Sequence, residues 1–231
     1  PDGHKLFRRS AATTHAVVNN LRGHLPERLG LTYGQLKDIN PAVVCGHLSA
    51  YGRDNERADW PGYDYLMQAE AGWMALTGEP DAPPTRAGLS LVDFMTGTVM
   101  TIGLLGALVD AQRSGVGRDV DVDLLSTALH QTSYPALWYM NEGDVTKRAA
   151  RSAHPSVTPS QLVRAADGWV FVMAQLPKFW TVLTERIGRS DLSNDPRFLT
   201  PADRLAHRGA LTSELDAIFS QHMVEHWVQL L

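Results

Sequence analysis

The sequence has a single cysteine among its 231 residues, Cys45, which excludes an internal disulfide. Cys45 lies in the apolar run 42–48 and is predicted to be a buried strand residue, which fits a protein of the reducing cytoplasm. Basic residues are not in excess, because 21 Lys and Arg face 25 Asp and Glu and the formal net charge is -4. We therefore expect no nucleic-acid partner, since no global positive field would attract phosphates.

Long hydrophobic segments are scarce as well. The first residues, 1–5, are polar, so no signal peptide is expected there. The uncharged run 94–109 contains three Thr and three Gly and is short for a membrane span, which predicts a buried core helix and no membrane partner. The chain has no initiator Met and its last residues, 225–231, have a mid-helix pattern, so we expect a fragment of a longer protein.

Metal-ligand and phosphate-loop motifs are also missing. The nine histidines are scattered, and His222 and His226 lack the Glu of an HExxH motif, so no metal site is expected. Gly115 and Gly117 precede a strand pattern rather than a helix, and neither a third Gly nor a Lys-Ser/Thr pair follows them. A phosphate loop is therefore not predicted.

The pattern that is present predicts an α/β fold. Apolar runs at 15–19 and 42–48 indicate two strands, and short helices between them make a βαβ unit, which implies a parallel sheet. Ligands of such sheets gather at the carboxyl ends of the strands. Asn20, Arg22 and Tyr51 are expected there.

The rest of the chain divides into two parts. Residues 1–140 are predicted to form a large domain, with further helices at 62–74, 94–109 and 124–140 and a strand at 119–124. Residues 141–164 lack apolar periodicity and are predicted to be a long linker. A smaller α/β domain is expected over 165–231, beginning with a turn at 167–168 and continuing with the predicted elements 169–174, 179–187, 201–220 and 225 onward.

The stretch GLSLVDFMTG, residues 88–97, places one carboxylate, Asp93, at the start of the uncharged run. Asp93 has two interpretations. It could be the N-cap of the helix, because an Asp side chain accepts hydrogen bonds from the first free amides. It could also be a covalent nucleophile, because the small residues around it would let a substrate carbonyl approach.

Several other side chains also have two interpretations. Arg22 and Arg28 follow the first strand and could bind ligand phosphates, or they could be ordinary surface arginines. Tyr63, next to Asp64 after a Pro-Gly turn, could pack in the core or donate its hydroxyl to a substrate carbonyl. The aromatic segment 134–139 could line an apolar acyl pocket or belong to the core.

The ordered set of these motifs resembles the family III CoA-transferases (CaiB/BaiF type), the group of formyl-CoA transferase, carnitine CoA-transferase and α-methylacyl-CoA racemase. No single motif is decisive, but together they cover nearly the whole chain in the family's order. The matching stretches are VNNLRGHLPERLGL (18–31), NPAVV (40–44), GYD (62–64), GLSLVDFMTG (88–97), GVGRDVDVDLL (115–125) and ADGWVFV (166–172).

The resemblance implies an architecture and a reaction. The large domain would be a Rossmann-like sheet that binds CoA, and the chain would form an interlocked homodimer. Asp93 corresponds to the family's catalytic aspartate, which attacks an acyl-CoA to give a mixed anhydride and later an aspartyl-CoA thioester. Acyl-CoA and a carboxylic acid would be the substrates, with no tightly bound cofactor. The expected CoA-binding residues are Asn20, Leu21, Arg22, Arg28, Tyr63 and Asp64.

Two departures from the family pattern bear on the function. Racemases have a His just after the Gly of the Gly-x-Asp motif, where this chain has Tyr63, and a phenol is a poor base at neutral pH. The region 149–159 has no glycine where formyl-CoA transferase has a Gly-rich loop, so the acyl group is not expected to be formyl or oxalyl. The alternatives to CoA transfer are an acyl-CoA racemase or epimerase and a non-catalytic CoA-binding protein.

Overall fold

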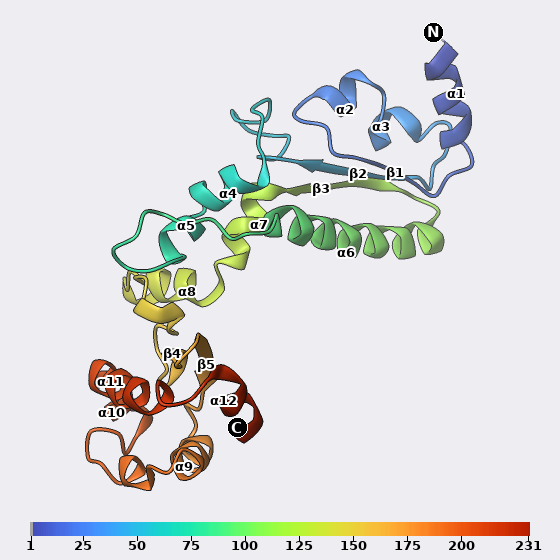
Figure 1. The fold of residues 1–231 in the computed structure, drawn as a ribbon. Helices are drawn as coiled ribbons and strands as arrows, with labels where there is room; N and C mark the ends of the chain where they lie inside the picture. The colour runs from blue at the N-terminus through green and yellow to red at the C-terminus, as the bar shows by residue number, and fades with distance from the viewer. Residues whose placement is uncertain (1) are drawn as a thin grey trace. The chain divides into compact units, whose positions relative to one another are not determined.

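The computed structural model describes residues 2–231, which form two compact units (Figure 1). Unit 1 comprises residues 2–77 and 85–145, and unit 2 comprises 78–84 and 146–231. The short segment 78–84 belongs to unit 2 and is tied to it by hydrogen bonds. The Glu79 carboxylate accepts from the backbone amide of Arg151 at 2.8 and 3.0 Å, and the Pro83 carbonyl accepts from the Arg148 side chain at 3.1 Å.

Unit 1 is built on a parallel sheet of three strands, which confirms the predicted α/β class. The strands are β1 (Ala16–Asn19), β2 (Val44–Ser49) and β3 (Arg118–Asp123), in the order β1-β2-β3. Because the strands are parallel, their carboxyl ends meet at one edge of the sheet. The helices of the connections are α2 (Leu25–Arg28) and α3 (Tyr33–Leu36) before β2, and α4 (Asp64–Glu70), α5 (Trp73–Leu76) and α6 (Leu91–Ser114) before β3.

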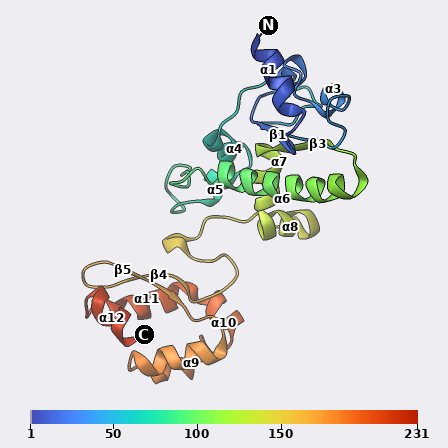
Figure 2. The same ribbon diagram turned by 90° about the vertical axis from the view of Figure 1, so that its right-hand side faces the viewer.

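Helices cover both faces of this sheet (Figures 1 and 2). On one face α6 lies along β2 and β3, and the lack of a side chain at Gly46 lets Met100 approach the strand. On the other face α1 (Asp2–Ala11) and α3 bury a small core that includes Leu36 and Cys45. The sequence pattern did not indicate α1.

Helix α6 confirms the predicted helix, but the prediction that it is buried is wrong for much of its surface. Its buried residues form one stripe toward the sheet, Val92, Thr96, Met100, Ala107 and Ala111. Other large apolar side chains of α6 are exposed in this chain, among them Phe94, Ile102 and Leu105. By length and composition alone α6 could cross a membrane, and 22% of its apolar window is buried in the structure.

The predicted helix 124–140 is interrupted. It forms α7 (Leu124–Gln131) and α8 (Ser133–Glu142), and Ser133, the first residue of α8, has a φ of 54°. Pro135 lacks an amide hydrogen and so cannot continue the hydrogen-bond pattern of α7. Asp123 caps α7 by accepting from the backbone amide of Ser126 at 2.7 Å.

Unit 2 pairs a two-stranded antiparallel sheet with helices. Its strands are β4 (Ser160–Arg164) and β5 (Trp169–Met173), joined by the predicted turn at 167–168. Strand β4 lies inside the stretch predicted to be a linker, where the alternation over five residues is too short to indicate a strand. The helices are α9 (Pro177–Arg186), α10 (Pro201–Ala206), α11 (Arg208–Phe219) and α12 (Val224–Leu230), with 3-10 turns at 150–152 and 190–193.

An arginine holds the interior of unit 2 together. Arg204 is fully buried, and its guanidinium donates to the backbone carbonyls of Thr158 at 3.1 Å, Phe198 at 3.0 Å and Gln175 at 2.7 Å. It also lies over the Trp180 ring, 5.2 Å from the ring centroid. A buried charge is tolerated when its donors are satisfied in this way.

Candidate active site

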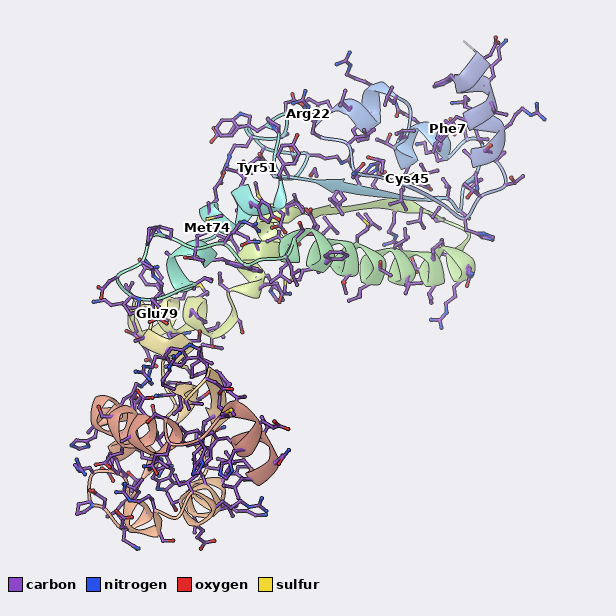
Figure 3. The ribbon with its side chains drawn as sticks, viewed as in Figure 1. Phe7, Arg22, Cys45, Tyr51, Met74 and Glu79 are labelled. Carbon is purple, nitrogen blue, oxygen red and sulfur yellow. The ribbon has the colours of Figure 1, made fainter. Side chains whose placement is uncertain are left out.

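A cavity of about 770 Å³ lies at the carboxyl edge of the unit 1 sheet. Five of the seven predicted site residues line it: Asn20, Leu21, Arg22, Tyr63 and Asp93. Figure 3 labels Arg22 and Tyr51 at this end of unit 1, at the ends of the first two strands. The remaining lining residues are Leu25, Leu48, Ser49, Ala50, Pro61, Gly62 and Leu124.

A chain of hydrogen bonds between polar side chains of the three strands holds the loop after β1 in place. Asp119 of β3 accepts from His47 of β2 at 2.8 Å, and the other ring nitrogen of His47 lies 2.9 Å from the Asn19 amide nitrogen. Asn19 in turn accepts from the backbone amide of Leu21 at 3.3 Å. The fully buried His47 therefore connects the sheet to the loop that carries Leu21 and Arg22.

Asp93 lies in the first turn of α6, with its side chain exposed to the cavity. The N-cap residue of α6 is Ser90, so the interpretation of Asp93 as the N-cap is wrong. Burial, and secondly the negative charge of Asp64, raise the pKa of Asp93 above its usual value. A carboxylate of raised pKa is a stronger nucleophile than an ordinary one, because basicity and nucleophilicity rise together within one class of group.

Asp64 lies beneath the cavity rather than on its wall. Only 3% of its surface is exposed, and one carboxylate oxygen accepts from the backbone amide of Asp93 at 3.1 Å. The other oxygen accepts from the Gln68 side chain at 2.6 Å. Asp64 therefore contacts the segment of Asp93 and does not itself line the cavity.

Arg28 is the other predicted site residue outside the cavity lining. It is exposed at the end of α2, one turn of chain beyond Leu25, which does line the cavity. Arg22 is also exposed, and it borders the cavity directly. Of the two arginines paired in the sequence analysis, the structure brings only Arg22 to the lining.

Tyr63 and Gly62 form a wall of the cavity that faces the end of β2. Tyr63 is 75% exposed, so its phenol is open to the cavity rather than packed in the core. At Gly62 a side chain has no room, since an added Cβ would lie 2.4 Å from the Cβ of Ala50 and 2.9 Å from the Cε of Met67. The sequence pattern did not mark Gly62 as a site residue, although its place in the Pro-Gly turn before Tyr63 was a usable signal.

The apolar lining residues were also missed, because Leu48, Ala50 and Leu124 look like ordinary core residues in the sequence. Their position at strand ends is the feature that brings them to the cavity. Over residues 2–231, no cluster of three or more His, Cys, Asp or Glu side chains is arranged to hold a metal ion.

Comparison with known proteins identifies the family of the chain. The model of CoA-transferase family III matches residues 1–231, and the chain belongs to that family. An acyl-CoA transferase of Fusarium pseudograminearum is 34% identical over 229 residues, 99% of this chain and 50% of its own length. The succinate–glutarate CoA-transferase of Agrobacterium fabrum is 31% identical over 208 residues, 90% of this chain and 52% of its own length.

Solved structures show the same fold. The chain superposes on Rv3272 from M. tuberculosis with a TM-score of 0.87 and 30% identity, covering 99% of this chain and 60% of that one. A CaiB/BaiF family protein from Brucella suis gives a TM-score of 0.84 at 30% identity, covering 99% and 61%. The chain thus spans about half the length of the curated relatives and about three fifths of the solved structures that it matches.

Proposed function

We propose that the protein transfers CoA from an acyl-CoA donor to a carboxylic acid, with Asp93 as the nucleophile. The observation that carries this proposal is the position of Asp93. It is exposed in a cavity at the carboxyl edge of a parallel sheet, where the loops after β1 and β2 meet the first turn of α6. Family membership supports the reaction class, since named relatives transfer CoA between acids.

The proposed chemistry needs no metal or redox group. The Asp93 carboxylate attacks the thioester carbonyl of the donor, the C–S bond breaks, and a mixed anhydride and CoA thiolate form. The thiolate attacks the Asp93 carbonyl, which releases the donor acid and leaves an aspartyl-CoA thioester. The acceptor acid then repeats the two steps in reverse, giving its own CoA ester and free Asp93.

Different lining residues would bind different parts of the acyl-CoA. Arg22 would pair with a phosphate of CoA, and the backbone of Asn20 and Leu21 would border the nucleotide. Tyr63 would donate its hydroxyl to the carbonyl oxygen on which negative charge develops. Arg28 and Asp64, which do not line the cavity, would act from its rim and from beneath it.

Relatives of this chain indicate the substrate class to test. They include a succinate–glutarate CoA-transferase, an acetyl-CoA:oxalate CoA-transferase from Acetobacter aceti and a succinyl-CoA–D-citramalate CoA-transferase from Chloroflexus aurantiacus. We propose a short-chain acid as acceptor. The lack of glycine in 149–159 disfavours oxalyl and formyl groups, so succinate and glutarate are the first candidates.

Family membership also supports proposals about the whole protein. It would act in the cytoplasm as an interlocked homodimer of two-domain chains. Light scattering on the full-length protein would give twice the chain mass if this is right, and the single-chain mass would refute the dimer.

A transfer assay on the full-length protein tests the proposal. Succinyl-CoA, glutaryl-CoA or acetyl-CoA is mixed with each of the other acids, and new CoA esters are detected by mass spectrometry. We expect exchange with the unmodified protein and at least a 10³-fold loss with Asp93→Asn, because the amide is not a nucleophile. Asp54→Asn, at an exposed carboxylate of the loop after β2, is the matched control and should leave the rate unchanged.

The same experiment separates the alternatives. A racemase or epimerase would put solvent deuterium at the α-carbon of an acyl-CoA without any acceptor acid, whereas the proposed transferase would not. A protein that only binds CoA would give no turnover, and its affinity for CoA would not change in Asp93→Asn.

A further inference from the structure

We infer that Asp64 and Gln68 are positioning residues, which together fix the segment 87–93 so that the Asp93 carboxylate points into the cavity. The inference deepens the proposed function and rests on it. Neither residue lines the cavity, so their effect on the reaction would pass through Asp93.

Both side chains direct their hydrogen bonds to one segment. Gln68 accepts from the backbone amide of Ala87 at 2.9 Å and donates to the carbonyl of Leu89 at 3.3 Å. Asp64 accepts from the backbone amide of Asp93 at 3.1 Å. The pair therefore holds the segment at its beginning, its middle and its end.

The two side chains are also bonded to each other and buried. Gln68 donates to Asp64 at 2.6 Å, Gln68 is fully buried, and Asp64 is 3% exposed. They lie one turn apart on α4, so the helix presents them side by side. Removing the Gln68 side chain would therefore leave the buried Asp64 carboxylate without one of its hydrogen-bond donors, which costs free energy.

This arrangement replaces an ordinary helix cap. The N-cap residue of α6, Ser90, makes no side-chain capping bond, and the amide of Asp93 in the first turn is satisfied by Asp64 instead. The start of α6 is thus fixed from another helix, α4. A cap supplied from α4 sets where α6 begins relative to the cavity, which a local Ser or Asp cap would not do.

Charge adds a second consequence. The hydrogen bonds to Asp64 come from a neutral amide side chain and a backbone amide, so neither donor neutralises its negative charge. Asp64 faces Asp93 from α4, while Tyr63 and Arg22 face the same cavity from the adjoining loops. Burial is the larger cause of the raised pKa of Asp93, and the negative charge of Asp64 is the second cause.

The test measures acylation of Asp93 directly in the full-length protein. Each variant is mixed with succinyl-CoA, the reaction is quenched with hydroxylamine at set times, and the hydroxamate on the Asp93 peptide is weighed. Gln68→Met keeps the side-chain volume but removes all three hydrogen bonds of Gln68. We expect it to slow acylation by about 10–100-fold while KM changes less than threefold, because a misplaced nucleophile loses rate rather than binding.

A matched control separates this role from simple destabilisation. Gln161 is also a buried glutamine, 2% exposed, which donates to Thr212 in unit 2 at 2.7 Å. Gln161→Met should lower stability without slowing acylation. Equal rates for Gln68→Met and Gln161→Met would overturn the inference.

A pH profile provides a readout that a merely structural role would not move. Asp64→Asn removes the charge, so the acidic limb of the acylation rate should shift to lower pH relative to the unmodified protein. Asp54→Asn should leave the limb in place, and an unshifted limb in Asp64→Asn would contradict the inference. Failure of the unmodified protein to acylate Asp93 would instead refute the proposed function.

Discussion

Gly62 offers a sharp test of the cavity geometry. In Gly62→Ala the new methyl group would lie 2.4 Å from the Cβ of Ala50, which is fixed to the end of β2. A normal contact is at least about 3.4 Å, so the 61–63 backbone must move by roughly 1 Å. Overpacking of this kind costs about 1–3 kcal/mol. Because the moving segment is a cavity wall, we also expect weaker binding of CoA.

The measurements are thermal unfolding by circular dichroism and CoA titration by calorimetry on the full-length protein. A loss of about 1–3 kcal/mol predicts a fall in Tm of roughly 2 °C for each kcal/mol, because the unfolding entropy grows with chain length. Gly34→Ala in α3 is the matched control, because an added Cβ there meets nothing within 4 Å. If Gly62→Ala had the Tm and CoA affinity of Gly34→Ala, the close approach of Gly62 to β2 would be refuted.

Two further predictions concern stability. Arg204→Met leaves the carbonyls of Thr158, Phe198 and Gln175 without their buried donor, and should destabilise unit 2 by about 3–5 kcal/mol in urea unfolding. An unchanged urea midpoint would contradict this role of Arg204. Burial alone would raise the pKa of Asp119, but the hydrogen bonds from His47 and the Tyr33 amide and the charges of His47 and Arg53 outweigh it and lower the pKa. A lowered folded pKa contributes stability above the unfolded value of about 3.9 that is lost at lower pH. The free energy of unfolding should therefore fall below about pH 4, and less steeply in Asp119→Asn; equal slopes would contradict this account.

The large features of the fold could be predicted because they depend on local patterns. Apolar runs identified β1 and β2, their spacing implied a parallel sheet, and that topology placed Asn20 and Arg22 at its carboxyl edge. The nucleophile candidate Asp93 followed from its place at the start of a long apolar segment. These predictions need only the order of elements, not their packing.

What the sequence did not reveal depends on contacts between distant residues. The role of Asp64 beneath Asp93 requires α4 to pack against the start of α6, 29 residues further along the chain. The close approach of Gly62 to Ala50 has the same origin. Helix α6 was expected to be buried because it is apolar, but apolarity does not say which residues of a helix have neighbours within this chain.

The break between α7 and α8 was missed for a local reason. Aromatic and apolar residues continue through 133–140 with helical spacing, and this hid the turn at Ser133. Pro135 two residues later was the available signal, since proline commonly occupies the first turn of a helix. The strand β4 escaped notice because an alternation over five residues is too short to indicate a strand.

The most direct test of Asp93 as the nucleophile is to follow the carboxylate oxygen atoms of the acceptor acid. In the proposed reaction the acceptor acid forms an anhydride with Asp93, and breakdown of that anhydride leaves one acceptor oxygen on the aspartate. The full-length protein should be turned over once with succinyl-CoA and ¹⁸O-labelled glutarate, digested, and the peptide containing Asp93 weighed. The account predicts a gain of about 2 Da on Asp93. Formation of glutaryl-CoA with no label on Asp93 would contradict it, because CoA would then have been transferred without a covalent aspartyl intermediate.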